Sequence, residues 1–501
     1  MPPPVPSLPA AAGVRIMRSQ STLPLLLTAA LSLLTGCMTT KQRLQSYANS
    51  VSVGNYTAAE SVVKDVATDN RSDGLCWQLH EASAQQWQLK LPESLSALER
   101  AEDRFLLYDA SSTLARGGRH AVAALSNDLT YPYEGYGQER IFCSLYKGLN
   151  YASAGRYDEA RVELNRAGEW QDKFLDTYRK QIAQAEEKLR NEASSHTQGK
   201  QEQYNSLSAS ILSSPQLAAS IQEQCGYDRG LQVSQEEVLT QLSQGDYFNT
   251  YACHVRGVFR WLNGDNARGD LKQISGALPG SALAARDFAE YEKGVKPQGQ
   301  AWIYVEDGLC PIRDEVKIHL PLGLIPMQHH ILYTGMAFPK LVGRSVASSR
   351  YSVSAGGVGP LELEQIMDVD HLVKTEFDIF MRGAISREVV RLVLRTLPQI
   401  VLAEAARRDD KNRGLWFLAQ VGVAAYAAAS MGADVRSWSA LPKRVLCQRV
   451  PFRPGETLVL RTDFREIPIP MPQCQNAIVV VRYPAQPASP SVQFITFSNK
   501  Q

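Results

Sequence analysis

The stretch Lys296-Pro-Gln-Gly-Gln-Ala-Trp-Ile-Tyr-Val-Glu-Asp-Gly308 divides the chain into two halves of different character. Around it, Gly294–Gln300 contains the proline and glycines that interrupt helices and strands. Ala301–Glu306 is rich in aromatic and β-branched residues, which favours a strand, and Asp307-Gly308 is typical of a turn. We therefore expect helices before residue 294 and a domain rich in strands over residues 301–501.

The first half, residues 46–293, is predicted to be α-helical because its apolar residues recur at spacings of three and four. A glycine, an aromatic residue and a small residue occur together in Gly54-Asn-Tyr56-Thr-Ala-Ala59 and again in Gly155-Arg-Tyr157-Asp-Glu-Ala160. The glycine allows a tight turn, and the alanine allows two helices to approach closely. Each copy therefore predicts a pair of packed helices.

One of these pairs resembles a known repeat. Gly148-Leu-Asn-Tyr151, followed by Ala160, Leu164 and Ala167, is similar to the tetratricopeptide repeat at its small and aromatic positions. The resemblance implies a repeat-like α-solenoid, and a generic helical bundle is the alternative. From 158 to 204 the sequence is charged and heptad-like, which predicts a long helical hairpin or a single solvated helix.

The second half, residues 301–501, is predicted to be an antiparallel β-sandwich-like domain with a helical insertion at about 361–431, so the fold class is α+β with several domains. Within the insertion, Leu415–Met431 is uncharged but shorter than the roughly 18–20 residues that span a bilayer. We expect a buried helix there, and a second membrane contact is the alternative. The further candidate strands are Glu315–Leu320, Gln328–Tyr333, Val450–Phe452, Thr457–Arg461, Ala477–Tyr483 and Val492–Phe497.

The N-terminal region has the pattern of an export signal. Arg15 and Arg18 precede an uncharged, leucine-rich stretch, which ends in Leu34-Thr-Gly-Cys37. These four residues resemble the lipobox of bacterial lipoproteins. The resemblance implies that residues 1–36 are a signal peptide, that the Cys37 thiol and the new amino group are acylated, and that residues 37–45 are a tether. Either Met1 or Met17 could be the initiator.

The residue after the lipidated cysteine is Met38 rather than an acidic residue. By resemblance to lipoprotein sorting, this favours the outer membrane, with the protein facing the periplasm. The composition, 44% hydrophobic and 21% charged, is that of an ordinary folded protein. The net charge of +2 provides no basic field for nucleic acid, so we expect no nucleic-acid partner.

Seven cysteines besides Cys37 leave at least one thiol unpaired in an oxidising compartment. Cys225 with Cys253, and Cys447 with Cys474, are candidate disulfides, and isolated buried thiols are the alternative. The sequence has no Cys-x-x-Cys pair, and we predict no metal and no cofactor.

Several segments resemble an uncharacterised family of bacterial envelope lipoproteins that join a tetratricopeptide-like helical half to a β-rich C-terminal half. The matching segments are Tyr133-Glu134, Gly148-Leu-Asn-Tyr151 with Glu163, Trp302-Ile-Tyr-Val-Glu-Asp-Gly-Leu-Cys-Pro311, Ala337-Phe-Pro339 and Ala433-Asp-Val-Arg-Ser-Trp-Ser-Ala-Leu-Pro442. The resemblance covers most of the mature chain and implies the architecture. It implies no particular activity.

The most distinctive polar cluster is Asp434, Arg436 and Trp438. An arginine beside an aromatic ring could dock a carboxylate or a sugar. We favour the structural interpretation, in which Asp434 and Arg436 form an ion pair that holds the helical insertion against the following strand.

Metal-ligand residue types come close together only at His329-His330 and at Asp368-Val-Asp370-His371. Adjacent histidines on a strand point to opposite faces, so they cannot bind one ion together. The second group precedes a helix and is typical of aspartate capping. Neither therefore predicts a metal site.

The sequence has no Gly-x-Ser-x-Gly, His-Glu-x-x-His, Walker loop or dinucleotide fingerprint, so we predict that the protein is not an enzyme. We expect a membrane-anchored, periplasmic, protein-binding scaffold of the cell envelope, with a role in cell-wall or envelope assembly. The alternative is a carbohydrate-binding protein or hydrolase with a cleft between the two halves, around Trp302, Arg436 and Trp438.

The lipobox makes a direct prediction about Cys37. The substitution Cys37→Ser is expected to abolish acylation and release the protein from the membrane, because no other cysteine follows small residues at the end of an apolar run. Labelling cells with a palmitate analogue measures this. Equal labelling of the wild type and the variant would contradict the assignment.

Overall fold

The computed structural model describes residues 38–68, 72–110, 132–196, 201–227, 231, 247–319, 335–408, 410–429 and 431–498. The expected signal peptide and the predicted lipidation site at Cys37 lie outside these residues. Residues Gln45–Gln501 form one compact unit. Within the described residues the protein is α+β, with helices from 40 to 292 and, from 300 onward, strands interrupted by a helical insertion.

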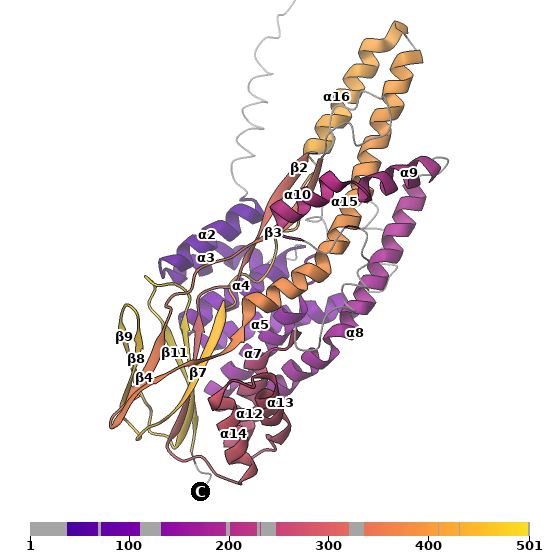
Figure 1. Cartoon of the computed structure of the whole chain (residues 1–501). Helices are drawn as coiled ribbons and strands as arrows, with labels where there is room; N and C mark the ends of the chain where they lie inside the picture. The colour runs from indigo at the N-terminus through magenta and orange to yellow at the C-terminus, as the bar shows by residue number, and fades with distance from the viewer. Residues whose placement is uncertain are drawn as a thin grey trace, which may run out of the picture. The chain divides into compact units, whose positions relative to one another are not determined.

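The helices of the N-terminal part pack mainly against their neighbours in sequence (Figure 1). Glycines with positive φ connect consecutive helices at two places, Gly54 at +76° and Gly155 at +75°. The turn at Gly155 joins a closely packed pair, as the repeated motif predicts, whereas the helix after Gly54 packs mainly on the helix that follows it. The helices are α2 (Thr40–Ser52), α3 (Tyr56–Ala67), α4 (Gly74–Trp87), α5 (Leu91–Ala110), α7 (Gly137–Ser153), α8 (Tyr157–His196), α9 (Gln201–Leu212), α10 (Pro215–Cys225), α12 (Thr250–Asn263), α13 (Arg268–Ala277) and α14 (Ala282–Glu292).

The pair α7–α8 contains the residues that resemble the tetratricopeptide repeat. Ala160, Leu164 and Ala167 are all buried. A Cβ atom added to Gly148 would lie 2.9 Å from the Leu164 side chain, so only glycine lets the two helices approach this closely here.

Residues 158–196 of the region 158–204 lie in one long helix, α8, whereas residues 197–200 lie outside the described residues and α9 begins at Gln201. Helix α8 runs without a break through 40 residues, and α9 follows it. Helix α8 contains no proline, and its one glycine, Gly168, lies where Arg256 of α12 crosses: an added Cβ would come 1.4 Å from Arg256 Nη1. That glycine permits a close approach between helices and makes no turn.

Strand β1 (Gln300–Asp307) is the middle strand of a five-stranded sheet with the order β11-β10-β1-β7-β6. It pairs in parallel with β10 and antiparallel with β7, so this sheet is mixed and not purely antiparallel as expected. The other members are β6 (Glu364–Asp368), β7 (Arg444–Pro451), β10 (Asn476–Tyr483) and β11 (Ser491–Phe497).

A four-stranded sheet, with the order β5-β4-β8-β9, and the two-stranded ribbon β2–β3 contain the other strands of the described residues. Strands β3, β4, β5, β6 and β9 were not expected from the sequence, and the expected strand 328–333 lies outside the described residues. The bounds are β2 (Ile312–His319), β3 (Gly335–Val342), β4 (Tyr351–Ala355), β5 (Val358–Glu362), β8 (Thr457–Thr462) and β9 (Glu466–Pro470).

Strand β1 is buried on both faces, because its alternate side chains point into two different environments. Ala301, Ile303 and Val305 belong to one apolar cluster with residues of β4, β8 and β9 from the four-stranded sheet. Trp302, Tyr304 and Glu306 point the other way, toward α12 and α14. The central strand thus has one apolar face and one face that carries polar atoms.

The helical insertion begins later than expected, because residues 364–368 form β6 and pair with β7. It consists of α15 (Val369–Arg408), the short helix η4 (Asp410–Asn412) and α16 (Arg413–Ala429). Figure 1 shows α15 and α16 side by side as a hairpin. Among the described residues, no helix is both long enough and apolar enough to cross a membrane.

The prediction that residues 415–431 form a buried helix is wrong. Helix α16 is buried on one side only, through Gln420, Ala424 and Ala427, and its exposed apolar side chains are Leu415, Phe417, Leu418, Val421 and Tyr426. A helix that packs on a single neighbouring helix cannot bury its whole circumference.

The two candidate disulfides do not form; all the described cysteines are free and buried. Cys447 lies in β7 and Cys474 directly before β10, on opposite sides of β1. Strands two positions apart are about 9–10 Å from each other, and a disulfide needs Cα atoms within about 7 Å. Cys225 and Cys253 belong to separate apolar clusters.

Candidate functional site

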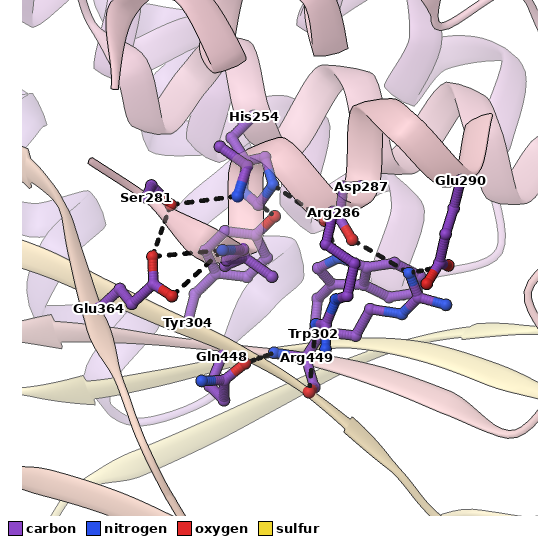
Figure 2. A network of polar contacts seen from close by, with 12 residues as sticks. His254, Ser281, Arg286, Asp287, Glu290, Trp302, Tyr304, Glu364, Gln448 and Arg449 are labelled. Atoms are coloured by element: carbon purple, nitrogen blue, oxygen red, sulfur yellow. Dashed lines mark hydrogen bonds and ion pairs between the residues drawn. The ribbon is translucent and has the colours of Figure 1, made fainter. Parts of the chain in front are cut away.

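A buried polar network lies between β1 and the helices α12 and α14 (Figure 2). We call it the central network, and it consists of His254, Asp287, Trp302, Tyr304 and Arg449. His254 comes from α12, Asp287 from α14, Trp302 and Tyr304 from β1, and Arg449 from β7. Each of these side chains is buried, so the network connects four elements without access to solvent.

Asp287 is the centre of this network. Its Oδ2 accepts a hydrogen bond from Trp302 Nε1 at 2.7 Å and lies 3.4 Å from His254 Nε2, while its Oδ1 accepts from Arg449 Nη1 at 3.0 Å. Burial alone would raise the pKa of Asp287, but the bonds from His254 and Trp302 and the charge of Arg449 lower it below its usual value. The carboxylate is therefore ionised and fully paired inside the protein.

The histidine of the network is oriented from both sides. Because the Asp287 carboxylate only accepts, His254 Nε2 carries the proton, and His254 Nδ1 accepts from the Tyr304 hydroxyl at 3.0 Å. Burial raises the pKa of Tyr304 and of the neighbouring Cys447 thiol well above their usual values. The phenol and the thiol stay neutral, which is the opposite of what an activated nucleophile needs.

Two further contacts fix α14 to the strands beside this network. Arg449 also bonds Glu290 of α14 at 2.7 Å and stacks over Trp302 at 4.7 Å. Glu364 of β6 accepts from Ser281 Oγ at 2.5 Å and from the Leu283 backbone N–H at 3.1 Å. A carboxylate at a helix N-terminus is favourable because it meets free N–H groups and the positive end of the helix dipole.

The predicted pair Asp434–Arg436 is present, with two parallel bonds of 2.8 Å from Arg436 Nε and Nη2 to the carboxylate. The side chain of Arg436 is 2% exposed and that of Asp434 24%. The Arg436 guanidinium also lies 5.5 Å from the centre of the Tyr133 ring, before α7. The pair therefore faces the helical half, whereas we expected it to face the strand that follows it.

Trp438 is anchored to the same helices. Its indole Nε1 donates to Ser83 Oγ of α4 at 2.8 Å, and its backbone N–H donates to Glu139 Oε1 of α7 at 2.6 Å. Burial raises the pKa of Glu139, although the bonds from Tyr133 and Trp438 act against this rise. The segment that contains the three predicted residues thus joins the strand-rich half to α4 and α7.

The rings around which the alternative interpretation placed a ligand cleft are both buried, Trp302 at 0% exposure and Trp438 at 1%. Each indole N–H is already bonded to a protein oxygen. A sugar-binding surface needs an exposed ring to stack against, and neither residue provides one.

A cavity of about 10 Å³ beside Asn249 and Arg256, between α8 and α12, has room for one water molecule.

The expected capping at the start of α15 is observed, since Asp368 Oδ1 accepts from the His371 backbone N–H at 3.1 Å. Asp370 forms an ion pair with Lys443. His329 and His330 lie outside the described residues. Within the described ranges no group of three or more metal-ligand side chains lies close enough together to bind an ion.

The central network was missed by the sequence analysis. Its members are separated by up to 195 positions, from His254 to Arg449, and nothing in the local sequence connects them. The one local signal was the alternation in β1, where Trp302, Tyr304 and Glu306 place polar atoms on one face of an otherwise apolar strand.

His80 of α4 is a second buried histidine, in contact with the segment that contains Trp438. Its Nδ1 donates to the Cys76 carbonyl at 2.7 Å, and its Nε2 accepts from the Ser439 hydroxyl at 3.0 Å. Burial lowers the pKa of His80 to about 4. The neutral ring is therefore the form that fits this part of the protein.

The ion pair of Arg436 can be tested by its effect on stability. Arg436→Ala leaves Asp434 without its partner in a largely buried place, which is expected to cost about 3–5 kcal/mol of unfolding free energy. The matched control Arg461→Ala breaks the exposed pair with Glu466 and should cost at most about 1 kcal/mol. Urea unfolding measures both, and equal losses would contradict a structural role for Arg436.

His80 predicts a pH dependence of stability. Since its folded pKa lies below the unfolded value of about 6.5, the unfolded chain binds the extra proton, and stability falls by up to about 3 kcal/mol as the pH drops from 6.5 toward 4. His80→Gln removes the titration of this histidine and leaves the carboxylates unchanged. The difference in unfolding free energy between the wild type and His80→Gln should therefore shrink as the pH drops from 6.5 toward 4. A difference that does not change with pH would contradict the prediction.

No protein-family model, no curated protein and no solved structure matches the chain. The family resemblance therefore rests on the sequence motifs alone, and what it implies about function enters below as a proposal.

Proposed function

We propose that this protein is a lipid-anchored lipoprotein of the outer membrane, facing the periplasm, that acts as a non-catalytic scaffold for another envelope protein. The sequence Leu34-Thr-Gly-Cys37 after an apolar run supports the anchor. Two acyl chains or more are needed for stable anchoring, and a lipidated cysteine with an acylated amino group supplies them.

The observation that carries the non-catalytic part of the proposal is the burial of the central network. His254, Asp287 and Tyr304 are residue types that catalysis uses, and each is enclosed and paired, while the neighbouring Cys447 thiol is also enclosed. A catalytic group must reach its substrate, directly or through one water molecule. These groups instead connect helices to strands, so they support a rigid body that presents its surface.

We assign the partner-binding surface to the helical half, as a repeat-like α-solenoid, with the strands as a sandwich-like support. Consecutive packed pairs such as α3–α4 and α7–α8 are consistent with this arrangement. Solenoids bind proteins through extended surfaces. Exposed apolar residues on this half include Leu106 and Leu107 of α5 and Val162 of α8.

Site-specific photocrosslinking in cells tests the scaffold. A photoreactive residue in place of Leu107 or Val162 should capture one and the same envelope protein, identified by mass spectrometry. Phe464, which is as exposed but lies in the loop between β8 and β9, is the matched control and should not capture it. The crosslinks should persist in Tyr304→Phe, which removes the hydroxyl group of the central network. Failure to capture a protein from the helical positions, or equal capture from Phe464, would contradict the proposal.

A further inference from the structure

Helix α16 carries the largest group of exposed apolar side chains in the described part of the chain. Leu415 is 65% exposed and Leu418 66%. Apolar side chains this exposed, several of them on one helix, indicate a surface that contacts something else. The other members of this apolar surface are Phe417, Val421 and Tyr426.

The apolar surface of α16 is not interrupted by charge. Residues 414–429 include no acidic or basic side chain, and their one amide, Gln420, is buried on the side that faces away from solvent. Helix α16 has 17 residues and is therefore about 25 Å long. That is shorter than the roughly 30 Å of a hydrocarbon core, so the helix suits a position along a bilayer surface and not one across it.

The turn of the hairpin is basic. Between the end of α15 and the start of α16 the sequence has Arg407, Arg408, Lys411 and Arg413 against Asp409 and Asp410, a surplus of two positive charges. Arg408 and Lys411 are exposed. Basic residues beside an apolar helix with aromatic residues are the combination that anionic lipid headgroups attract.

We propose that the tip of the α15–α16 hairpin binds an anionic phospholipid surface, with the exposed face of α16 inserted among the headgroups and the basic turn against their phosphates. The charge favours this occupant over a second copy of the chain, because two such turns brought together would repel each other. A chain that is also lipidated at Cys37 is held near lipid, which raises the effective concentration of the surface that the hairpin meets.

Vesicle flotation tests the proposal. The protein would be the mature chain from residue 37 with Cys37→Ser, which keeps every described residue and carries no lipid. It should float with vesicles of phosphatidylethanolamine and phosphatidylglycerol. Leu415→Ser with Leu418→Ser should lower the partition coefficient at least about tenfold, since each leucine loses its burial in lipid.

Two further variants test whether vesicle binding is specific to α16 and whether it depends on the basic turn. Leu106→Ser with Leu107→Ser is the matched control, because these leucines are 53% and 62% exposed on α5, and it should leave the partition unchanged. Arg408→Glu with Lys411→Glu should weaken binding by roughly fivefold or more per residue on the anionic vesicles, with little change on neutral phosphatidylcholine vesicles.

Two outcomes would overturn the proposal. One is no flotation of the parent protein, and the other is an equal loss in the α5 control. If the parent protein does not float, a dimer in sedimentation velocity that disappears in the α16 variant would assign this surface to a second copy. The test uses protein without the anchor, so its failure would leave the proposed lipidation and scaffold role untouched.

Discussion

The structure depends on one buried charge, the carboxylate of Asp287. An ionised carboxylate inside a protein is strongly unfavourable unless donors and a positive charge surround it. Here Arg449 provides the charge, and Trp302 and His254 provide the donors, each from a different element. Each partner is thereby held in place, since a shift of any one would leave the charge partly unpaired. These contacts therefore fix the positions of α12, α14, β1 and β7 relative to one another.

The same requirement explains why two halves that differ so much in sequence belong to one compact unit. Strand β1 has an apolar face for the second sheet and a polar face for the helices, so it contributes to both sides at once. The segment with Trp438 makes a second connection, from beyond the hairpin back to α4 and α7. The change in composition near residue 294 marks a change of secondary structure and not a gap between independent bodies.

Local features of the fold could be predicted, and distant pairings could not. The strand at 301–306 and the glycine connections at Gly54 and Gly155 follow from residue types within a few positions. The ion pair of Asp434 with Arg436 was equally local. The central network and the partners of Trp438 depend on contacts across hundreds of residues, which periodicity does not contain. The exposure of α16 was missed because a helix that faces lipid and a helix buried in protein have the same composition.

The parallel pairing of β1 with β10 has a consequence for how the chain reaches its folded state. The middle strand of the sheet is completed by residues 476–483, close to the C-terminus. Long-range pairing of this kind is slow, because a large loop must close before the contacts form. A chain delivered N-terminus first has Asp287 and the apolar side of α14 in place well before Arg449 and β10 arrive. During that interval the helical half exposes surface that later becomes interior, and incomplete states of this kind are prone to aggregate. A holding chaperone would therefore matter most between the emergence of α14 and that of β10.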